Sequence, residues 1–141
     1  MNLINLLSIS ACVSPILILK VMISIFLAIL FLQSGLDKLI DWKGNFEWLK
    51  GHFANSPFKN FVPFLLGTIS IFETAAGACS AIGIFELIFT EGARFAMYGL
   101  LLAGLSILCL LFGQRMAKDY AGAAVLVGYF LVVLFGIYLY A

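Results

Sequence analysis

The sequence predicts an all-α integral membrane protein, a four-helix bundle with a short amphipathic interfacial helix between its first and second spans. Three observations predict this class. Apolar residues make up 64% of the 141 residues and charged residues only 11%, against about 25% charged residues in a soluble domain. A surface so poor in charge would aggregate in water, so lipid is the expected solvent. The apolar residues form four long runs without strand-like alternation, which argues against a barrel.

The four runs cover about residues 16–36, 61–85, 95–112 and 121–140. Each run is close to the roughly 20 residues that a helix needs to cross the hydrocarbon core. Pro15 and Pro63 stand near the starts of the first two runs, where the first-turn N–H groups have no helical partner and proline is tolerated. The length predicts a single domain over residues 1–141. Residues 1–14 are also apolar and either extend the first helix or lie in the interface.

The long connection between the first two runs contains a helical pattern of its own. Apolar residues recur there at helical spacing, at Trp42, Phe46, Leu49 and Phe53, and charged residues stand between them, at Lys43, Glu47 and Lys50. This pattern predicts a short amphipathic helix that lies in the interface with its apolar face toward the lipid. The alternative is a helix that only caps the end of the bundle. We expect Ser56 and Pro57 to end it.

The distribution of cations predicts how the protein is oriented. In a four-span protein the connections 37–60 and 113–120 share one side, and they hold Lys38, Lys43, Lys50, Lys59, Arg115 and Lys118. The opposite side has Lys20, Arg94 and the amino terminus. By the positive-inside rule, both connections are expected in the cytoplasm and both termini on the outer side.

Glu73 is the most informative polar residue, because it falls within the second apolar run. A carboxylate at membrane depth is costly unless it is neutral, paired with a cation or in contact with water. One interpretation is a carboxylate that carries a proton or orients a ligand. The other is a hydrogen bond between helices that stabilises their packing.

A second polar group is expected at the cytoplasmic ends of the first and third spans. Its members are Gln33, Ser34, Asp37 and Lys38 on the first span, and Gln114, Arg115, Lys118 and Asp119 on the third. Gln33 and Asp37 are four residues apart, as are Arg115 and Asp119, so each pair shares a face if the helix continues that far. Lys38 or Arg115 would then be near enough to neutralise Glu73 or the aspartates. Alternatively, Asp119 caps the fourth helix and Lys38 extends to the head groups.

Small residues indicate where helices pack. Three pairs at four-residue spacing, Gly77 with Ala81, Gly99 with Ala103, and Ala124 with Gly128, would each allow two helix backbones to approach closely. Gly77, Gly99 and Gly128 are therefore the predicted packing glycines. The Gly99 pair would serve equally well against a partner protein.

Several function classes are excluded or disfavoured. Cys12, Cys79 and Cys109 are far apart and form no C-x-x-C motif, and His52 is the only histidine. We therefore expect no metal site, no haem with paired histidines and no local dithiol chemistry. A net charge of +1 gives no reason to expect a nucleic-acid partner. No catalytic residue can be named, and His52 remains a candidate for hydrogen bonding.

Three features together carry a family resemblance. They are FLQSGLDKL at residues 31–39, the E-x-x-x-G of Glu73 and Gly77, and a four-span chain of this length. With GQRMAKDYAGAA at residues 113–124, which resembles a bacterial subset, they make the chain similar to the DoxX family, in the branch grouped with MauE-type membrane proteins. The resemblance covers nearly the whole chain, and Gly35, Lys38 and Leu39 also match its general pattern.

The resemblance implies a bacterial inner-membrane protein linked to redox chemistry. DoxX-like proteins are associated with thiosulfate:quinone oxidoreduction, terminal oxidases and oxidative-stress complexes. We accordingly expect an accessory or small subunit of a quinone-linked or respiratory complex, with no cofactor of its own and with quinone as its candidate ligand. Its partners would be lipid and either other membrane subunits or further copies of itself. Hydrogen bonds to a quinone would come from Gln33, Asp37, His52, Glu73 and Gln114.

Two alternatives remain open. Some relatives in the resembled family assist the assembly of larger membrane proteins, so a non-catalytic structural or assembly protein is the main one. A small proton-coupled transporter that uses Glu73 is a minor one.

Overall fold

The computed structural model describes residues 14–141, which form five helices and no strand. The helices are α2 (Pro15–Ile40), α3 (Trp42–His52), α4 (Val62–Phe89), α5 (Arg94–Met116) and α6 (Tyr120–Tyr138). All except α3 are long and apolar enough to cross a membrane. The predicted all-α fold with four spans and a short connecting helix is thus confirmed. Whether residues 1–14 extend the first helix concerns a segment that lies, except for Ser14, outside the described residues.

The three longest helices extend beyond the predicted spans into polar sequence. Helix α2 continues through Lys38 to Ile40, α4 through Glu86 to Phe89, and α5 through Arg115 to Met116. The apolar runs predicted only the part of each helix that suits the hydrocarbon core of the membrane. The backbone hydrogen bonds of a helix do not depend on lipid, so the helix continues until a turn ends it.

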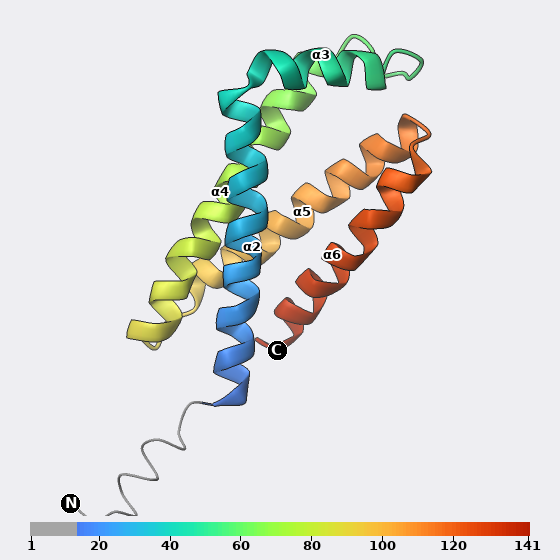
Figure 1. Ribbon diagram of the computed structural model, residues 1–141. Coiled ribbons are helices and arrows are strands. Elements are labelled where there is room, and N and C mark those ends of the chain that lie inside the picture. The colour runs from blue at the N-terminus through green and yellow to red at the C-terminus, as the bar shows by residue number, and fades with distance from the viewer. Residues whose placement is uncertain (1–13) are drawn as a thin grey trace, which may run out of the picture.

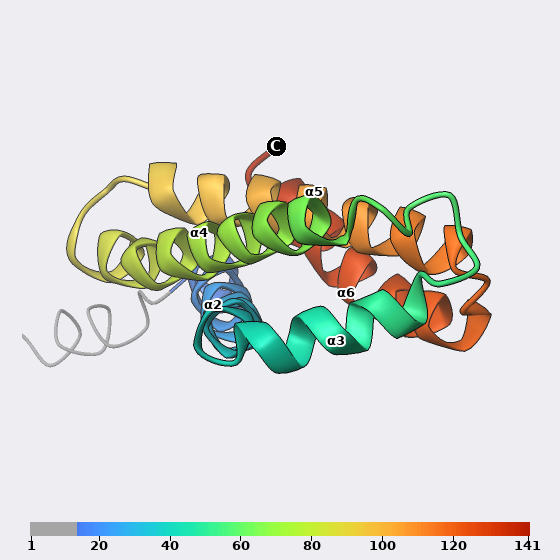
Figure 2. The same cartoon turned by 90° about the horizontal axis from the view of Figure 1, so that it is seen from above.

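The four spanning helices are arranged around α4. Figure 1 shows α2 crossing α4, with α5 and α6 forming a hairpin beside them, and α4 packs along both α2 and α5. Helix α3 lies across one end of the bundle, and the view from above shows it running beside α4, from the end of α2 toward the turn between α5 and α6 (Figure 2). The start of α2 and the C-terminus both lie at the opposite end (Figure 1).

Glycines set the close approach of α2 to α4. A Cβ atom at Gly77 would lie 2.5 Å from the backbone nitrogen of Leu32, and one at Gly35 would lie 2.7 Å from the backbone nitrogen of Thr74. A larger side chain at either position would force the two backbones apart. This is the small-residue packing expected of membrane helices.

Of the predicted packing glycines on α5 and α6, Gly99 lies at a helix contact and Gly128 does not. A Cβ at Gly99 would lie 2.9 Å from the backbone nitrogen of Ser80, so Gly99 is at the contact between α4 and α5. No atom of residues 14–141 lies within 4 Å of a Cβ at Gly128, and both Ala124 and Gly128 are exposed. The contact of α6 with α5 instead uses Gly136, beside the side chain of Leu100.

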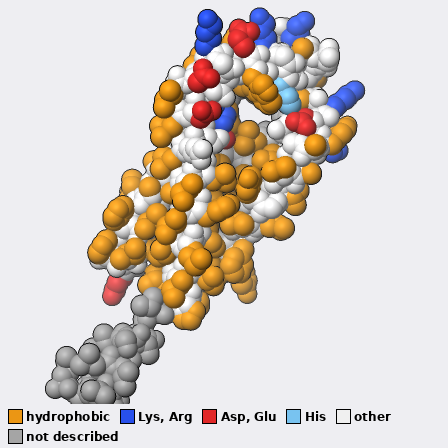
Figure 3. Space-filling view, in the orientation of Figure 1, with side chains coloured by type: hydrophobic (Ala, Val, Ile, Leu, Met, Phe, Trp, Pro, Cys, Tyr) orange, Lys and Arg blue, Asp and Glu red, His pale blue; other side chains and the backbone are white. Residues whose placement is uncertain are grey.

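The core is small, and most large apolar side chains face outward. Its buried centre consists of Leu27, Phe31, Ala76, Leu100, Ala103, Ile107 and Val133. Figure 3 shows hydrophobic side chains over the body of the molecule and charged side chains gathered at the α3 end. Because an apolar surface of this extent needs lipid around it, the chain is a multi-pass membrane protein.

Helix α3 forms between two clear boundaries. The Asp41 side chain accepts a hydrogen bond from the Gly44 N–H at 3.1 Å and so caps its start. The helix ends at His52, earlier than Ser56 and Pro57, where we had expected it to end. Phe53 follows directly and is buried, and Phe46 and Leu49 are half-buried. These three residues of the predicted apolar face therefore pack inward and not toward the lipid, whereas Trp42 is exposed.

The turn between α5 and α6 corrects one expectation. Helix α5 ends at Met116, and Lys118 adopts a positive φ of 60°. The chain reverses there, so Arg115 and Asp119 do not share a helix face. Asp119 instead accepts a hydrogen bond from the Gly122 N–H at 2.9 Å and caps α6, which is the capping role that the sequence left open.

Candidate functional site

Glu73 lies at the interface between α4 and α2 and has a cation beside it. Only 2% of its side chain is exposed, and its Oε2 atom lies 2.8 Å from Nζ of Lys38. The Ser34 hydroxyl donates a hydrogen bond to the same oxygen at 3.0 Å. The carboxylate is therefore compensated by Lys38 of α2, which the sequence had offered as one of two possible cations.

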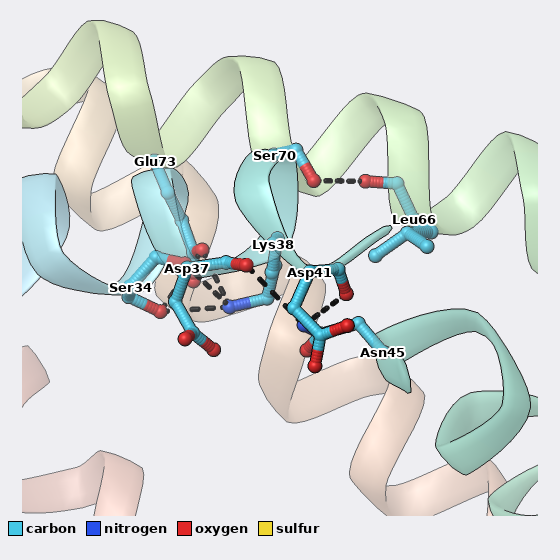
Figure 4. A network of polar contacts seen from close by, with 8 residues as sticks. All are labelled: Ser34, Asp37, Lys38, Asp41, Asn45, Leu66, Ser70 and Glu73. Atoms are coloured by element: carbon cyan, nitrogen blue, oxygen red, sulfur yellow. Dashed lines mark hydrogen bonds and ion pairs between the residues drawn. The ribbon is translucent and has the colours of Figure 1, made fainter. Parts of the chain in front are cut away.

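Lys38 has an acceptor for each of its three ammonium N–H groups. Besides Glu73, its Nζ donates to the Ser34 backbone carbonyl at 3.2 Å and to the Ser34 hydroxyl at 2.7 Å. Lys38 and Ser34 are four residues apart, so one turn of α2 brings both to Glu73 (Figure 4). Lys38, Ser34 and Glu73 form what we call the Glu73 cluster.

The Glu73 cluster joins the end of α2 to the middle part of α4. Lys38 stands in the last turn of α2, yet its ammonium reaches back along the helix to Ser34 and Glu73. A lysine at a membrane boundary ordinarily extends toward water. The inward direction of Lys38 indicates that the attraction of the carboxylate outweighs hydration of the ammonium at this position.

Gln33 and Asp37 do not join the cluster. Both are exposed on α2, and the Asp37 carboxylate is turned away from Glu73 (Figure 4). Asp37 contributes its backbone carbonyl, which accepts from the Asp41 N–H at 2.9 Å. The four-residue spacing of Gln33 and Asp37 does place them on one face, but that face points outward, whereas Ser34 and Lys38, one position further on, face α4.

His52, Gln114 and Asp119 form a second cluster, which joins α3 to the turn between α5 and α6. Nε2 of His52 lies 3.1 Å from Oε1 of Gln114 and 4.0 Å from Oδ2 of Asp119. The amide oxygen can only accept, so Nε2 carries the proton of the shorter contact. The Trp48 ring stacks on His52 with ring centroids 4.6 Å apart, which restricts the orientation of the imidazole.

Arg115 belongs to neither cluster. Its guanidinium lies over the Tyr120 ring, 4.6 Å from the ring centroid, and it is exposed. This cation–π contact holds it at the turn between α5 and α6. The alternative that Arg115 neutralises Glu73 is therefore wrong.

The two clusters flank an opening in the surface. Figure 3 shows this opening below α3, with charged side chains of both signs and the histidine gathered around it. Helix α2 and the α5–α6 hairpin diverge toward this end (Figure 1). His52 at the end of α3 and Phe53 just after it reach the hairpin beside Gln114 and Gly113. About 18% of the Lys38 side chain and 15% of the His52 side chain are exposed, so both remain partly accessible.

Chemically, the site provides hydrogen-bond donors and a compensated carboxylate. Across residues 14–141, the His, Cys, Asp and Glu side chains form no group of three that would hold a metal ion. Cys79 and Cys109 are both free thiols.

Comparison of the chain with models of protein families, with curated proteins and with solved structures found no match.

Sequence reasoning identified Glu73, Lys38, His52 and Gln114 but not the central position of Ser34. Ser34 was one of several polar residues near the end of the first run. The signal that separates it from Gln33 is its four-residue spacing from Lys38, combined with Gly35 next to it, where α2 approaches α4.

Proposed function

We propose that this chain is a DoxX-like accessory subunit of a bacterial inner-membrane redox complex, and that the opening below α3 holds a quinone head group. The observation that carries the proposal is the Glu73 cluster, an ion pair beside an opening in an otherwise apolar membrane domain. Charges inside membrane segments are rare and generally mark ligand or proton pathways.

The donor set around the opening fits a quinone. Quinone carbonyl oxygens accept hydrogen bonds, and the Lys38 ammonium and the Gln114 amide are donors of the required kind. The Ser34 carbonyl accepts the longest of the three Lys38 bonds, at 3.2 Å, so this bond is the one that would be exchanged for a ligand. The surrounding aromatic side chains, including Trp48 and Phe53, suit a flat ring.

When bound, a quinone would supply two-electron redox chemistry, with the electrons coming from a partner subunit. The residues of this chain would hold the quinone head group and balance the charges beside it. Lys38 would orient an oxygen of the ligand, and the Glu73 carboxylate would keep the ammonium in place and accept or release a proton through Ser34. His52 would be held in a fixed orientation by Trp48 and Gln114 on the opposite side of the opening.

The experiment is to purify the protein gently, extract its lipids and measure quinone per chain, together with co-purifying proteins. We expect near-stoichiometric quinone and a redox partner, and a clear loss of quinone in Glu73→Gln. Glu47→Gln is the matched control, since Glu47 is an exposed carboxylate on α3. Unchanged quinone in Glu73→Gln would contradict the proposed site, and a partner without redox cofactors would contradict the redox assignment.

A second candidate function, a structural or assembly subunit, is favoured by a different observation. Ala124 and Gly128 form a small-residue face on α6 that no helix of the described chain covers. Such a face allows another membrane helix to approach closely. In addition, every N–H of the Lys38 ammonium already has an acceptor within the chain, which is the arrangement expected of a purely structural pair.

Gly128→Leu tests this candidate. Because nothing lies within 4 Å of that position, the substitution should leave the isolated chain folded and should release a partner that docks there. Val125→Leu, at an exposed position on the same helix, is the control. Retention of the partner in Gly128→Leu would exclude this face as the docking surface.

A further inference from the structure

The end of the molecule opposite α3 carries a groove that the proposed function does not use. The groove runs between α2 and α6 and has a volume of about 440 Å³. Its walls are apolar and are formed by Leu19, Met22, Ile23, Phe26, Leu131, Val132 and Phe135. It is open to the side, toward the surrounding lipid.

A cation stands beside this groove. Lys20 follows the groove residue Leu19 directly and precedes Ile23 by one helical turn. Its Nζ atom lies over the Tyr140 ring, 4.1 Å from the ring centroid. Within residues 14–141, no carboxylate lies within the 4.0 Å that defines an ion pair with Lys20. Among residues 14–141, Lys20 is thus a half-buried cation held over the Tyr140 ring without a direct ion-pair partner.

The neighbouring polar groups of residues 14–141 form no direct ion pair with Lys20. Tyr140 lies beyond the end of α6, and burial together with the charge of Glu86 raises the pKa of its phenol, so the ring remains neutral. The Glu86 carboxylate accepts a hydrogen bond from the Phe95 N–H at 2.7 Å and so is engaged at the start of α5.

The depth of Lys20 matches a lipid head group. Lys20 lies in the second turn of α2 and Lys38 in its last turn. At about 1.5 Å per residue the two are about 27 Å apart along the axis, close to the roughly 30 Å thickness of the hydrocarbon. Lys20 therefore stands near the boundary opposite α3, where lipid phosphates lie.

We propose that the α2–α6 groove binds one anionic phospholipid, with an acyl chain along the groove and the phosphate against the Lys20 ammonium. Charge complementarity selects an anionic lipid, because its phosphate would pair with Lys20 and, unlike that of phosphatidylcholine, has no ammonium in the same head group to offset its charge. The shape of the walls selects an acyl chain over a helix. Phe26 and Phe135 are large, whereas close contact between membrane helices needs small residues.

The test is native mass spectrometry of the whole protein in detergent, titrated with phosphatidylglycerol or with phosphatidylcholine of the same acyl chains. We expect the wild type to retain one phosphatidylglycerol and to prefer it to phosphatidylcholine by about fivefold, the effect of one basic residue at a membrane surface. Lys20→Gln should lose this preference. Lys43→Gln, which removes the same charge from exposed α3, should keep it.

A second variant tests the groove independently of the charge. Leu131→Trp introduces a bulky side chain into the groove at a position that is 61% exposed, so the fold should tolerate it. It should lower retention of both lipids. Equal retention of the two lipids by the wild type, or an unchanged preference in Lys20→Gln, would overturn the proposal. So would a dimer that retains no lipid, since a second copy would then occupy the groove.

Discussion

The buried Glu73 carboxylate on α4 is compensated by two residues near the end of α2. Burying Glu73 alone would be costly, and the structure offsets the cost with a cation at 2.8 Å and a hydroxyl at 3.0 Å. Replacing a buried pair with apolar residues is often neutral or stabilising, whereas removal of one partner is strongly destabilising. A variant in which both charged residues are replaced can therefore keep its stability while losing any function of the pair, so mutations can distinguish the two roles.

Glu73→Gln should destabilise the protein because it leaves the Lys38 ammonium without a counter-charge. We expect a loss of about 3 kcal/mol, at the lower end for a broken buried pair, because 18% of the Lys38 side chain is already exposed. The measurement is thermal unfolding in detergent. The double variant Lys38→Met with Glu73→Leu should recover most of the loss. If Glu73→Gln and the wild type unfold alike, the pair does not stabilise the fold.

Lys118 offers an independent test at the residue scale. Its φ of 60° lies in the left-handed region, which costs a non-glycine residue about 1–2 kcal/mol. Lys118→Gly should therefore stabilise the protein by about 1 kcal/mol. Lys118→Ala removes the same charge without relieving the strain and should not stabilise it. Equal unfolding temperatures for the two variants would argue against a strained turn.

At the scale of elements, the contact between α2 and α4 depends on glycines more than on large side chains. Gly77 and Gly35 let the two backbones approach closely enough for Ser34 and Lys38 to reach Glu73. Packing and site are therefore coupled, because a wider separation would lengthen every contact of the Glu73 cluster. Helix α6 makes fewer contacts and leaves Ala124 and Gly128 open.

The same substitution at two glycines should have different effects on stability. Gly77→Ala places a Cβ 2.5 Å from the Leu32 backbone nitrogen and should destabilise the protein by about 1–3 kcal/mol. Gly128→Ala meets no atom of the described residues within 4 Å and should be neutral, or stabilising by up to about 1 kcal/mol, because alanine is the better helix former. Thermal unfolding in detergent compares the two. A tolerated Gly77→Ala would mean that the close α2–α4 contact is not required.

At the scale of the whole molecule, charge is concentrated at one end. Figure 3 shows Lys, Arg, Asp and Glu side chains clustered around α3, and the apolar body below it. With Lys20 and Arg94 at the other end, the positive-inside rule predicts that α3 faces the cytoplasm. The same asymmetry would present the proposed quinone opening on the cytoplasmic side and the proposed lipid groove on the outer side.

Single-cysteine labelling checks this orientation. In a variant that lacks Cys12, Cys79 and Cys109, Glu91→Cys reports on the α4–α5 connection and Lys59→Cys on the α3–α4 connection. Both positions are exposed. We expect a membrane-impermeant maleimide to label Glu91→Cys in intact cells and Lys59→Cys only after permeabilisation. The reverse pattern would invert the topology.

The candidate site was predictable from sequence only in part. Glu73 stood out because a carboxylate in an apolar run needs compensation, and Lys38 was a natural partner at the end of the preceding run. Gln33 and Asp37 were expected beside them but lie on the exposed face of α2. The rotation of a helix about its axis depends on what packs against it, and along α2 this is decided by Gly35 and Gly77, which belong to different helices.

The sequence by itself determined the class, the number of spans and the existence of α3. Each depends on the local distribution of apolar and polar residues, because hydrogen bonding within a helix and transfer into lipid are both local properties. Only the tertiary structure decided that Lys38 and not Arg115 neutralises Glu73, that His52 meets Gln114, and that Gly128 stays open. These outcomes depend on distances between residues far apart in the chain, which are set by helix packing that local composition does not encode.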